Sequence, residues 1–196
     1  KIMIAQPTFF PWLGYFDLIS QADQFVILDD VDFSYQSWQH RNNFKTPKGL
    51  EMFTISVKEG KKKKKINEVE LKNSKIITKK LNKFISSNYG KSKYFKTIYE
   101  NLSNTLEKSL ASDSLVVLNC EIIKWCLKFL NIKTPISYSS EININSHRAH
   151  RIIDICNIYN ANEYISTPGA KVYLNDDANE FKKNNIKLTY HNYKHP

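Results

Sequence analysis

The residues best suited to chemistry follow the first apolar segment of the chain. Residues 5–15 read AQPTFFPWLGY and contain two prolines, four aromatic side chains and one glycine. A loop that leaves a buried strand and enters a helix is where open α/β sheets bind ligands, since the free N–H groups of the helix N-terminus favour anions. An aromatic plug at the sheet edge would explain the composition equally well. The binding interpretation predicts contacts from Gln6, Pro7, Phe10, Trp12, Gly14 and Tyr15, with the glycine allowing a ligand or a neighbouring chain to approach closely.

Two adjacent acids, Asp29 and Asp30, follow the second apolar segment. Carboxylates at the C-terminal end of a strand can bind a metal, act as a general base or accept hydrogen bonds from sugar hydroxyls. We predict that both acids belong to a catalytic site, and Mg²⁺ is the cofactor that such a pair brings into consideration. Exposed acids in a turn are the commoner explanation for any single one.

A polar and aromatic stretch over residues 35–43 leads into a predicted hairpin. Within it, His40 has the chemistry of a general base, and Arg41 can hold a phosphate or a carboxylate through two parallel hydrogen bonds. Asn42 adds an amide next to them. A lone histidine more often has a structural role, but the short chain distance to Asp29 favours chemistry. We therefore predict His40 as a catalytic residue, with Arg41 and Asn42 as substrate-binding residues.

A second candidate binding loop lies near the C-terminus, where residues 164–173 read YISTPGAKVY. A strand is expected first, followed by a loop of small residues with one lysine. Hydroxyls, backbone N–H groups and a lysine around a glycine suit a phosphate. An ordinary Pro-Gly turn is the alternative. The predicted binding residues are Ser166, Gly169, Lys171 and Tyr173.

The remaining histidines and the cysteines carry less information. The pairs His147/His150 and His191/His195 have spacings that metals accept, but no cysteine or carboxylate completes a recognised pattern, so we predict surface positions for both pairs. Three cysteines without a close pair predict free buried thiols rather than a disulfide framework. They are Cys120, Cys126 and Cys156.

Hydrophobic periodicity predicts the elements that must position these residues. Strands are expected at 2–5, 24–28, 135–138, 163–165 and 186–190, with a hairpin over 44–57. Helices are expected from Pro11 to about residue 19 and over 74–88, 92–110, 113–130 and 148–159. This order predicts a mainly parallel, Rossmann-like α/β sheet with a hairpin excursion and a helical middle insertion. We expect one domain over 1–196, with 1–60 and 131–196 as its α/β core and 74–130 as the insertion.

Charge and hydropathy indicate which binding partners suit the protein and in which cellular compartment it is expected. The net charge is +10, and the run from Lys61 to Lys65 supplies five of these charges. A nucleotide, a phosphosugar or RNA would all fit this moderate excess. No apolar run is long enough to cross a bilayer and the N-terminus lacks a signal-peptide core, so the sequence predicts a cytoplasmic protein without membrane insertion.

Taken together, the motifs resemble the WbqC-like family, bacterial proteins associated with gene clusters for O-antigen lipopolysaccharide and other surface polysaccharides. The residues that carry the resemblance are Gln6-Pro7, Phe10-Pro11-Trp12-x-Gly14-Tyr15-Phe16, Ala22-Asp23, Phe25, Asp29-Asp30, Arg41-Asn42, Ser139-Ser140-Glu141, residues 151–156, Tyr164-Ile165-Ser166, Gly169 and Tyr173-Leu174. The resemblance implies that the family's sequence continues past Lys194 into another apolar, tyrosine-containing segment, so that a C-terminal part of the site is missing here.

The resemblance also implies an activity, the transfer of glycine or a similar acyl group to the amine of a nucleotide-linked amino sugar. In that role His40 or Asp30 would be the base and Asn42 or a backbone N–H the oxyanion donor. A charged tRNA, an activated amino acid or a thioester would be the acyl donor. The alternative is a binding or scaffold protein that holds a nucleotide sugar without chemistry.

A weaker similarity connects the chain to nucleotidylyltransferases. Trp12-x-Gly14-Tyr15 occupies the position of their His-x-Gly-His motif, and Ile165-Ser166-Thr167 is similar to their second phosphate-binding motif. Both motif histidines are aromatic residues here. The similarity therefore implies a nucleotidylyltransferase-like fold and nucleotide binding, without nucleotidyl transfer by the usual histidines.

Overall fold

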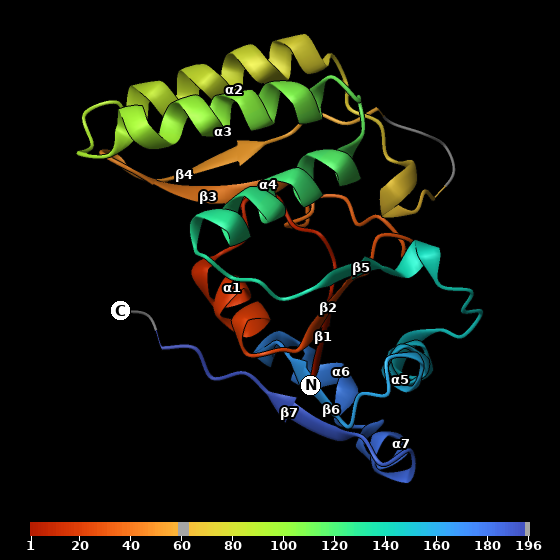
Figure 1. Cartoon of the computed structure of the whole chain (residues 1–196). Coiled ribbons are helices and arrows are strands. Elements are labelled where there is room, and N and C mark those ends of the chain that lie inside the picture. The colour runs from red at the N-terminus through yellow and green to blue at the C-terminus, as the bar shows by residue number, and fades with distance from the viewer. Residues whose placement is uncertain (59–62, 195–196) are drawn as a thin grey trace. The chain divides into compact units, whose positions relative to one another are not determined.

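A computed structural model describes residues 1–58 and 63–194 of the chain (Figure 1). The chain divides into two compact units. The first consists of Lys1–Gln6, Trp12–Asp29 and Asn131–Pro196, and the second of Pro7–Pro11 and Asp30–Leu130. Residues 30–58, which the sequence assigned to the α/β core, therefore belong to the second unit. The expectation of a single domain stays a prediction.

The first unit contains a five-stranded parallel sheet with the strand order β5-β2-β1-β6-β7. The strands are β1 (Ile2–Ala5), β2 (Gln24–Ile27), β5 (Ile136–Tyr138), β6 (Glu163–Ser166) and β7 (Lys187–Tyr190). The chain adds β2 and β5 on one side of β1, and then β6 and β7 on the other. The strand order thus reverses between β1 and β6, as in doubly wound sheets. The predicted Rossmann-like fold is confirmed, and β1 lies at the centre of its sheet.

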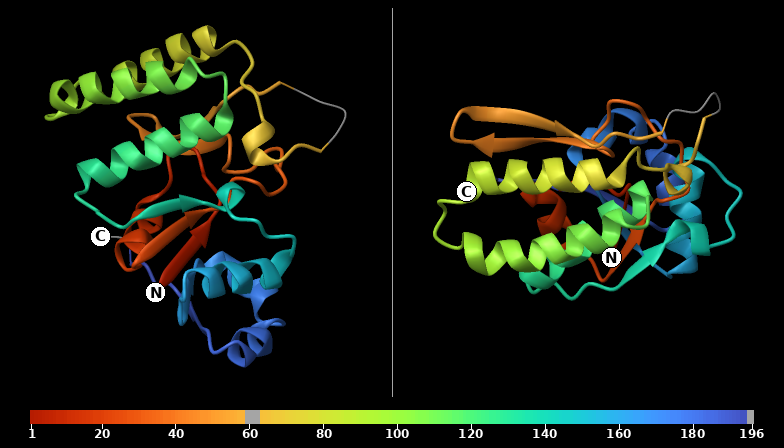
Figure 2. Two further views of the ribbon diagram at one scale, coloured as in Figure 1. Left: turned by 45° about the vertical axis from the view of Figure 1, so that its right-hand side comes forward. Right: turned by 90° about the horizontal axis from the view of Figure 1, so that it is seen from above.

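Helices cover both faces of this sheet (Figure 2). Helix α1 (Leu13–Ser20) packs on one face, where the rings of Tyr15 and Phe25 lie edge to face with centroids 5.8 Å apart. The opposite face of β1 and β2 packs against α5 (Arg148–Ile158), α6 (Lys171–Leu174) and α7 (Ala178–Lys183). Two short 3₁₀ turns, Ser139–Glu141 and Pro168–Ala170, follow β5 and β6. Because side chains alternate along a strand, this burial on both faces explains the near-continuous apolar runs.

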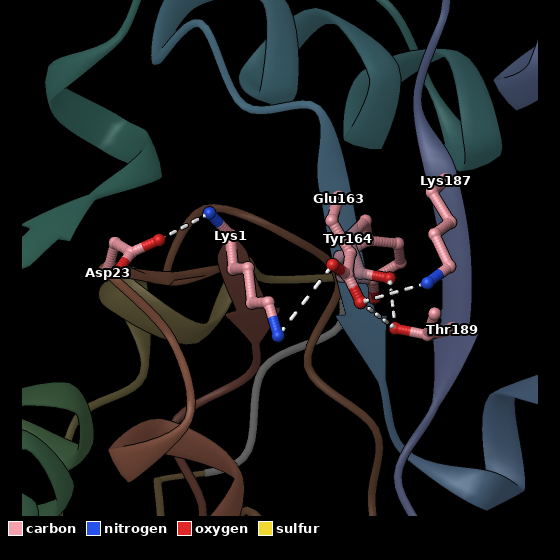
Figure 3. A network of polar contacts seen from close by, with 6 residues as sticks. All are labelled: Lys1, Asp23, Glu163, Tyr164, Lys187 and Thr189. Carbon is pink, nitrogen blue, oxygen red and sulfur yellow. Dashed lines mark hydrogen bonds and ion pairs between the residues drawn. The ribbon is translucent and has the colours of Figure 1, made fainter.

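Ion pairs join the strands at the amino edge of the sheet, as Figure 3 shows. The Glu163 carboxylate lies 3.8 Å from Lys1 Nζ and 3.9 Å from Lys187 Nζ, and it accepts a hydrogen bond of 3.2 Å from Thr189 Oγ1. The backbone amino group of Lys1, as distinct from its side-chain Nζ, lies 2.6 Å from Asp23 Oδ2. The charged groups drawn here are thus paired with one another.

The second unit combines a hairpin with three helices. The hairpin strands are β3 (Arg41–Thr46) and β4 (Gly49–Thr54), and a short 3₁₀ turn, Ile66–Glu68, follows them. The helices are α2 (Ser74–Tyr89), α3 (Phe95–Leu110) and α4 (Leu115–Phe129), with α2 beside α3 and α3 beside α4 (Figure 2). Their apolar faces form one core around the fully buried ring of Phe9. The predicted hairpin and helical insertion are confirmed, but the hairpin spans residues 41–54 rather than 44–57, so that Arg41 and Asn42 lie within β3.

Several predicted boundaries are wrong for identifiable reasons. Helix α1 begins at Leu13 rather than Pro11, because Trp12 is extended and Phe10 has a φ of 44°. Helices α3 and α4 begin three and two residues later than predicted. The segment after β6 is helical from Pro168 to Leu174 rather than a loop, and α7 was not predicted. Helices this short contain too few residues to display a hydrophobic period.

Within residues 1–58 and 63–194, no helix is both long and apolar enough to cross a membrane.

Candidate functional site

A buried hydroxyl that needs explanation lies in the first unit, at the carboxyl end of β6. Ser166 is 2% exposed, and its hydroxyl has no hydrogen-bond partner among the residues that the structure describes. Buried hydroxyls are almost always hydrogen-bonded, so an unpaired one requires an explanation. Strand β6 is next to β1, at the point where the strand order reverses, which is where open α/β sheets bind ligands. A ligand that hydrogen-bonds to Ser166 would satisfy this hydroxyl.

A histidine and an aspartate form a pair beside this strand end. The backbone N–H of His191 donates to the Ser166 carbonyl at 2.9 Å, which places His191 directly after β7 at the same edge. Its Nε2 lies 2.6 Å from Oδ2 of Asp17 on α1, a distance at which a protonated Nε2 donates a hydrogen bond to the carboxylate. The other ring nitrogen, Nδ1, is buried without a partner in the described part of the chain. A carboxylate thus orients an imidazole whose second nitrogen can accept a proton.

The prediction that His191 lies on the surface is wrong, because this residue is only 6% exposed. Helix α1 contributes Asp17, whose carboxylate contacts Nε2 of the ring. His147 and His150 are exposed, as predicted. His195 lies outside the described residues.

Two further aromatic rings extend from the histidine. Tyr193 stacks on the His191 ring with centroids 6.0 Å apart, and Trp12 meets Tyr193 edge to face at 5.3 Å. Trp12 is 43% exposed. The indole also explains Gly14, because a Cβ at that position would lie 2.0 Å from Cζ3 of Trp12. The group that approaches this glycine closely is therefore the Trp12 ring.

The other predicted residues of the first unit surround the same strand ends. Tyr15 is buried and donates a hydrogen bond of 3.1 Å to the carbonyl of Gln6, the exposed residue after β1. Gly169 and Lys171 are exposed, and Lys171 Nζ lies 5.8 Å from the centre of the Tyr190 ring. Tyr173 lies in α6, and its side chain is outside the description. These positions leave the predicted binding roles as predictions.

Asp29 holds the end of β2 to the turn after β5. Its carboxylate is 5% exposed and accepts three hydrogen bonds, from Ser139 Oγ at 3.2 Å and from the N–H and Oγ of Ser140 at 2.9 and 2.6 Å. These hydrogen bonds give Asp29 a structural role. A catalytic role would require its carboxylate to exchange one or more of them for a contact with substrate. No group of three or more histidine, cysteine or acidic side chains is placed to hold a metal ion in the described residues.

In the second unit, two asparagines fix the motif loop from Pro7 to Pro11. Asn119 of α4 is fully buried and donates to the carbonyl of Pro7 at 3.1 Å. Asn42 of β3 donates to the carbonyls of Phe9 and Phe10 at 3.0 and 2.6 Å. The predicted binding residue Asn42 thus acts on the backbone of the loop in this structure.

The His40 ring is bonded at both nitrogens. Nδ1 donates to the Ile55 carbonyl and Nε2 accepts from the Gln36 N–H, each at 3.0 Å. A general base needs a nitrogen that reaches substrate, so the catalytic prediction for His40 requires one of these bonds to open. The neighbouring Arg41 is half-buried, and its Nε is buried without a partner among the described residues. This unpaired donor keeps Arg41 as a candidate for binding an anion.

The predicted site residues therefore fall into two sets. The first unit contains Gln6, Trp12, Gly14, Tyr15, Asp29, Ser166, Gly169, Lys171 and Tyr173. The second contains Pro7, Phe10, Asp30, His40, Arg41 and Asn42. Sequence reasoning missed Asp17, His191 and Tyr193. The position of His191, one residue after a predicted strand, was the signal that could have found it.

A parallel sheet of this order defines a Rossmann-like α/β protein. Among the described residues, buried polar atoms without a partner lie where the order reverses, which makes the carboxyl edge of the sheet a candidate ligand site. The chain belongs to the WbqC-like protein family, whose model matches residues 6–196. It is 31% identical over 195 residues to the uncharacterized protein Rv1507c of Mycobacterium tuberculosis, an alignment that covers 98% of this chain and 82% of that protein. No solved structure matches the chain.

Proposed function

We propose that this protein binds a nucleotide-linked amino sugar at the carboxyl edge of the parallel sheet and transfers an acyl group, glycyl or similar, to the sugar amine. The pathway would be the cytoplasmic biosynthesis of O-antigen or another surface polysaccharide. The observation that carries the proposal is the arrangement of Ser166, His191 and Asp17 at this edge. Two of these three side chains, Ser166 and His191, have a buried polar atom without a partner among the described residues.

The groups at this edge match the parts of a nucleotide sugar. Aromatic rings such as Trp12 and Tyr193 can stack on any nucleobase, since every base has a π-face. The Ser166 hydroxyl, the exposed backbone at Gly169 and the Lys171 ammonium suit a phosphate. The sugar amine would then lie near His191, after the rings that stack beside the imidazole have moved to admit it.

The proposed chemistry uses His191 as the general base. As the amine nitrogen attacks the acyl carbon, its surplus proton passes to Nδ1 of His191, and Asp17 stabilises the resulting imidazolium. The bond between the acyl carbon and its leaving oxygen or sulfur then breaks, and the departing alcohol or thiol takes the proton. An aminoacyl ester, as in a charged tRNA, or a thioester would serve as the donor. An activated amino acid would bring a different leaving group.

Binding is tested by thermal shift, because a ligand that binds only the folded protein raises its melting temperature. We expect a uridine or thymidine diphosphate amino sugar to raise Tm more than the matching sugar without an amine. Ser166→Ala should remove most of this shift. A flat response to every nucleotide sugar tested would contradict the proposed substrate class.

Chemistry is tested by mass spectrometry of the sugar after incubation with glycyl-tRNA, a glycyl adenylate or a glycyl thioester. His191→Asn should lower turnover by at least 100-fold, the scale of a lost general base, while the thermal shift persists. The exposed His147→Asn is the matched control and should keep full activity. If the His191→Asn variant kept the turnover of the wild type, His191 would not be the general base.

A binding protein without chemistry is the second candidate. The engagement of His40 and Asp29 in structural hydrogen bonds favours it, since both ring nitrogens of His40 and both carboxylate oxygens of Asp29 already take part in hydrogen bonds. A selective thermal shift without any acylated product from the three donors would support this candidate over the transferase.

A further inference from the structure

The second unit contains an apolar cavity of about 390 Å³, large enough for a small-molecule ligand. Its walls come from α2, α3, the loop that joins them, strand β3 and the motif loop. The apolar lining includes Phe10, Phe44, Ile85, Ile98, Tyr99 and Leu102. The cavity lies wholly within one unit, so its shape depends only on contacts inside that unit.

One wall of the cavity is held in a strained conformation. Phe10 has a φ of 44°, which is rare for a bulky residue and costs about 1–3 kcal/mol. The bonds from Asn42 to the carbonyls of Phe9 and Phe10 maintain this backbone, and the Phe10 ring packs edge to face on Phe44 at 5.5 Å. Strain that the surrounding structure maintains in this way is typical of ligand sites.

The hydroxyls of Tyr89 and Tyr99 in the cavity wall already have hydrogen-bond partners. Tyr89 donates to the Lys45 carbonyl at 2.9 Å, and Tyr99 lies 3.5 Å from the Asn82 carbonyl. Burial raises the pKa of Tyr89, so this phenol stays a neutral donor. The interior therefore offers hydrocarbon contacts, and the buried part of a ligand that matches it must itself be hydrocarbon.

The opening of the cavity is cationic. Ser92, Lys93 and Tyr94 line the cavity and are exposed, so it meets solvent at the corner between α2 and α3. Lys93 lines the opening, Lys91 and Lys96 lie close to it along the chain, and residues 90–99 contain no acid. A ligand that enters here would meet positive charge at the surface and apolar side chains below it.

We infer that this cavity binds a single aliphatic chain of a molecule with an anionic head group, with the head at Lys93 and the chain against Phe10 and Ile98. A methylene group takes up roughly the volume of a water molecule, about 30 Å³, so a cavity of about 390 Å³ has room for about thirteen such groups and accommodates a chain of ten carbon atoms. The inference is independent of the proposed acyl transfer.

The first test is calorimetric titration of the full chain with sodium decanoate. We expect one site per chain and an affinity that rises about fourfold with each methylene from hexanoate to decanoate. Ile98→Trp should fill the cavity and weaken decanoate binding at least tenfold. Ile76→Trp, at a 51% exposed position of α2, is the matched control and should bind like the wild type.

The second test concerns the head group and remains decisive if Ile98→Trp does not fold. Lys93→Ala should weaken decanoate several-fold and leave decanol unchanged, whereas Lys96→Ala, which is exposed and does not line the cavity, should alter neither. Absence of saturable decanoate binding by the wild type would overturn the inference. Affinities without a chain-length dependence, or equal losses of decanoate and decanol in Lys93→Ala, would also overturn it.

Discussion

Replacement of Asn42 by alanine tests whether this side chain holds the motif loop. The substitution removes both hydrogen bonds from Nδ2, to the carbonyls of Phe9 at 3.0 Å and Phe10 at 2.6 Å. Each bond contributes about 1 kcal/mol net, and a carbonyl left buried and unpaired costs more. Relaxation of the positive φ at Phe10 returns part of that loss. We therefore expect the free energy of unfolding to fall by about 1–3 kcal/mol.

Thermal unfolding followed by calorimetry measures this loss. For a chain of this size, 1 kcal/mol corresponds to about 2–4 °C in Tm, so Asn42→Ala should melt roughly 3–9 °C lower. Asn42→Asp keeps the size of the side chain but cannot donate these hydrogen bonds, so its Tm should be no higher than that of Asn42→Ala. The neighbouring Asn43 is exposed and provides the matched control, with a shift near zero for Asn43→Ala. Equal melting temperatures for the Asn42 and Asn43 alanine variants would refute the reasoning.

Three further outcomes follow from individual contacts. Gly14→Ala places a methyl group on the Trp12 ring, so it should shift the tryptophan emission and reduce nucleotide-sugar binding. Burial raises the pKa of the Cys126 and Cys156 thiols to about 12, so at pH 8 only about one such thiol in ten thousand is the reactive thiolate. These two thiols should resist Ellman's reagent at pH 8 in the native protein and react after denaturation. Asp29→Ala removes an acceptor of three hydrogen bonds, so it should lower the free energy of unfolding by about 3 kcal/mol in urea titrations.

Each of these outcomes has a clear contrary result. Unchanged emission in Gly14→Ala would mean that the Trp12 ring does not pack on residue 14. Rapid labelling of Cys126 or Cys156 in the native protein at pH 8 would contradict their raised pKa. A thiol stays almost wholly protonated, and therefore unreactive, at a pH well below its pKa. A loss in Asp29→Ala no larger than that of an exposed acid such as Asp176→Ala would contradict the bonding at the end of β2.

The elements with strong periodicity were predictable from the sequence. Buried parallel strands read as short apolar runs, and all five predicted strands of the parallel sheet form where expected. The hairpin and the three long helices also form, because their patterns extend over many residues. The short helices α6 and α7 were not predictable in the same way, since packing against the sheet rather than local pattern stabilises them.

The site was only partly predictable, because residue type does not reveal whether a polar atom is already bonded. His40 and His191 both lie in polar, aromatic stretches of the sequence. One has both ring nitrogens bonded to backbone groups, and the other has a buried Nδ1 without a partner among the described residues. The difference arises from contacts with residues 15 and 174 positions away, Ile55 and Asp17.

The sequence alone determined the fold class and the family to which the chain belongs, and it predicted a ligand site at the carboxyl ends of the strands. These properties reside in local patterns of apolar, aromatic and small residues. Only the tertiary structure decided which polar groups are free to bind a ligand, because hydrogen bonds between distant segments satisfy His40, Asp29 and Asn42. It also decided that the Phe10 ring lines an apolar cavity, since that role depends on a backbone conformation that Asn42 maintains from another strand.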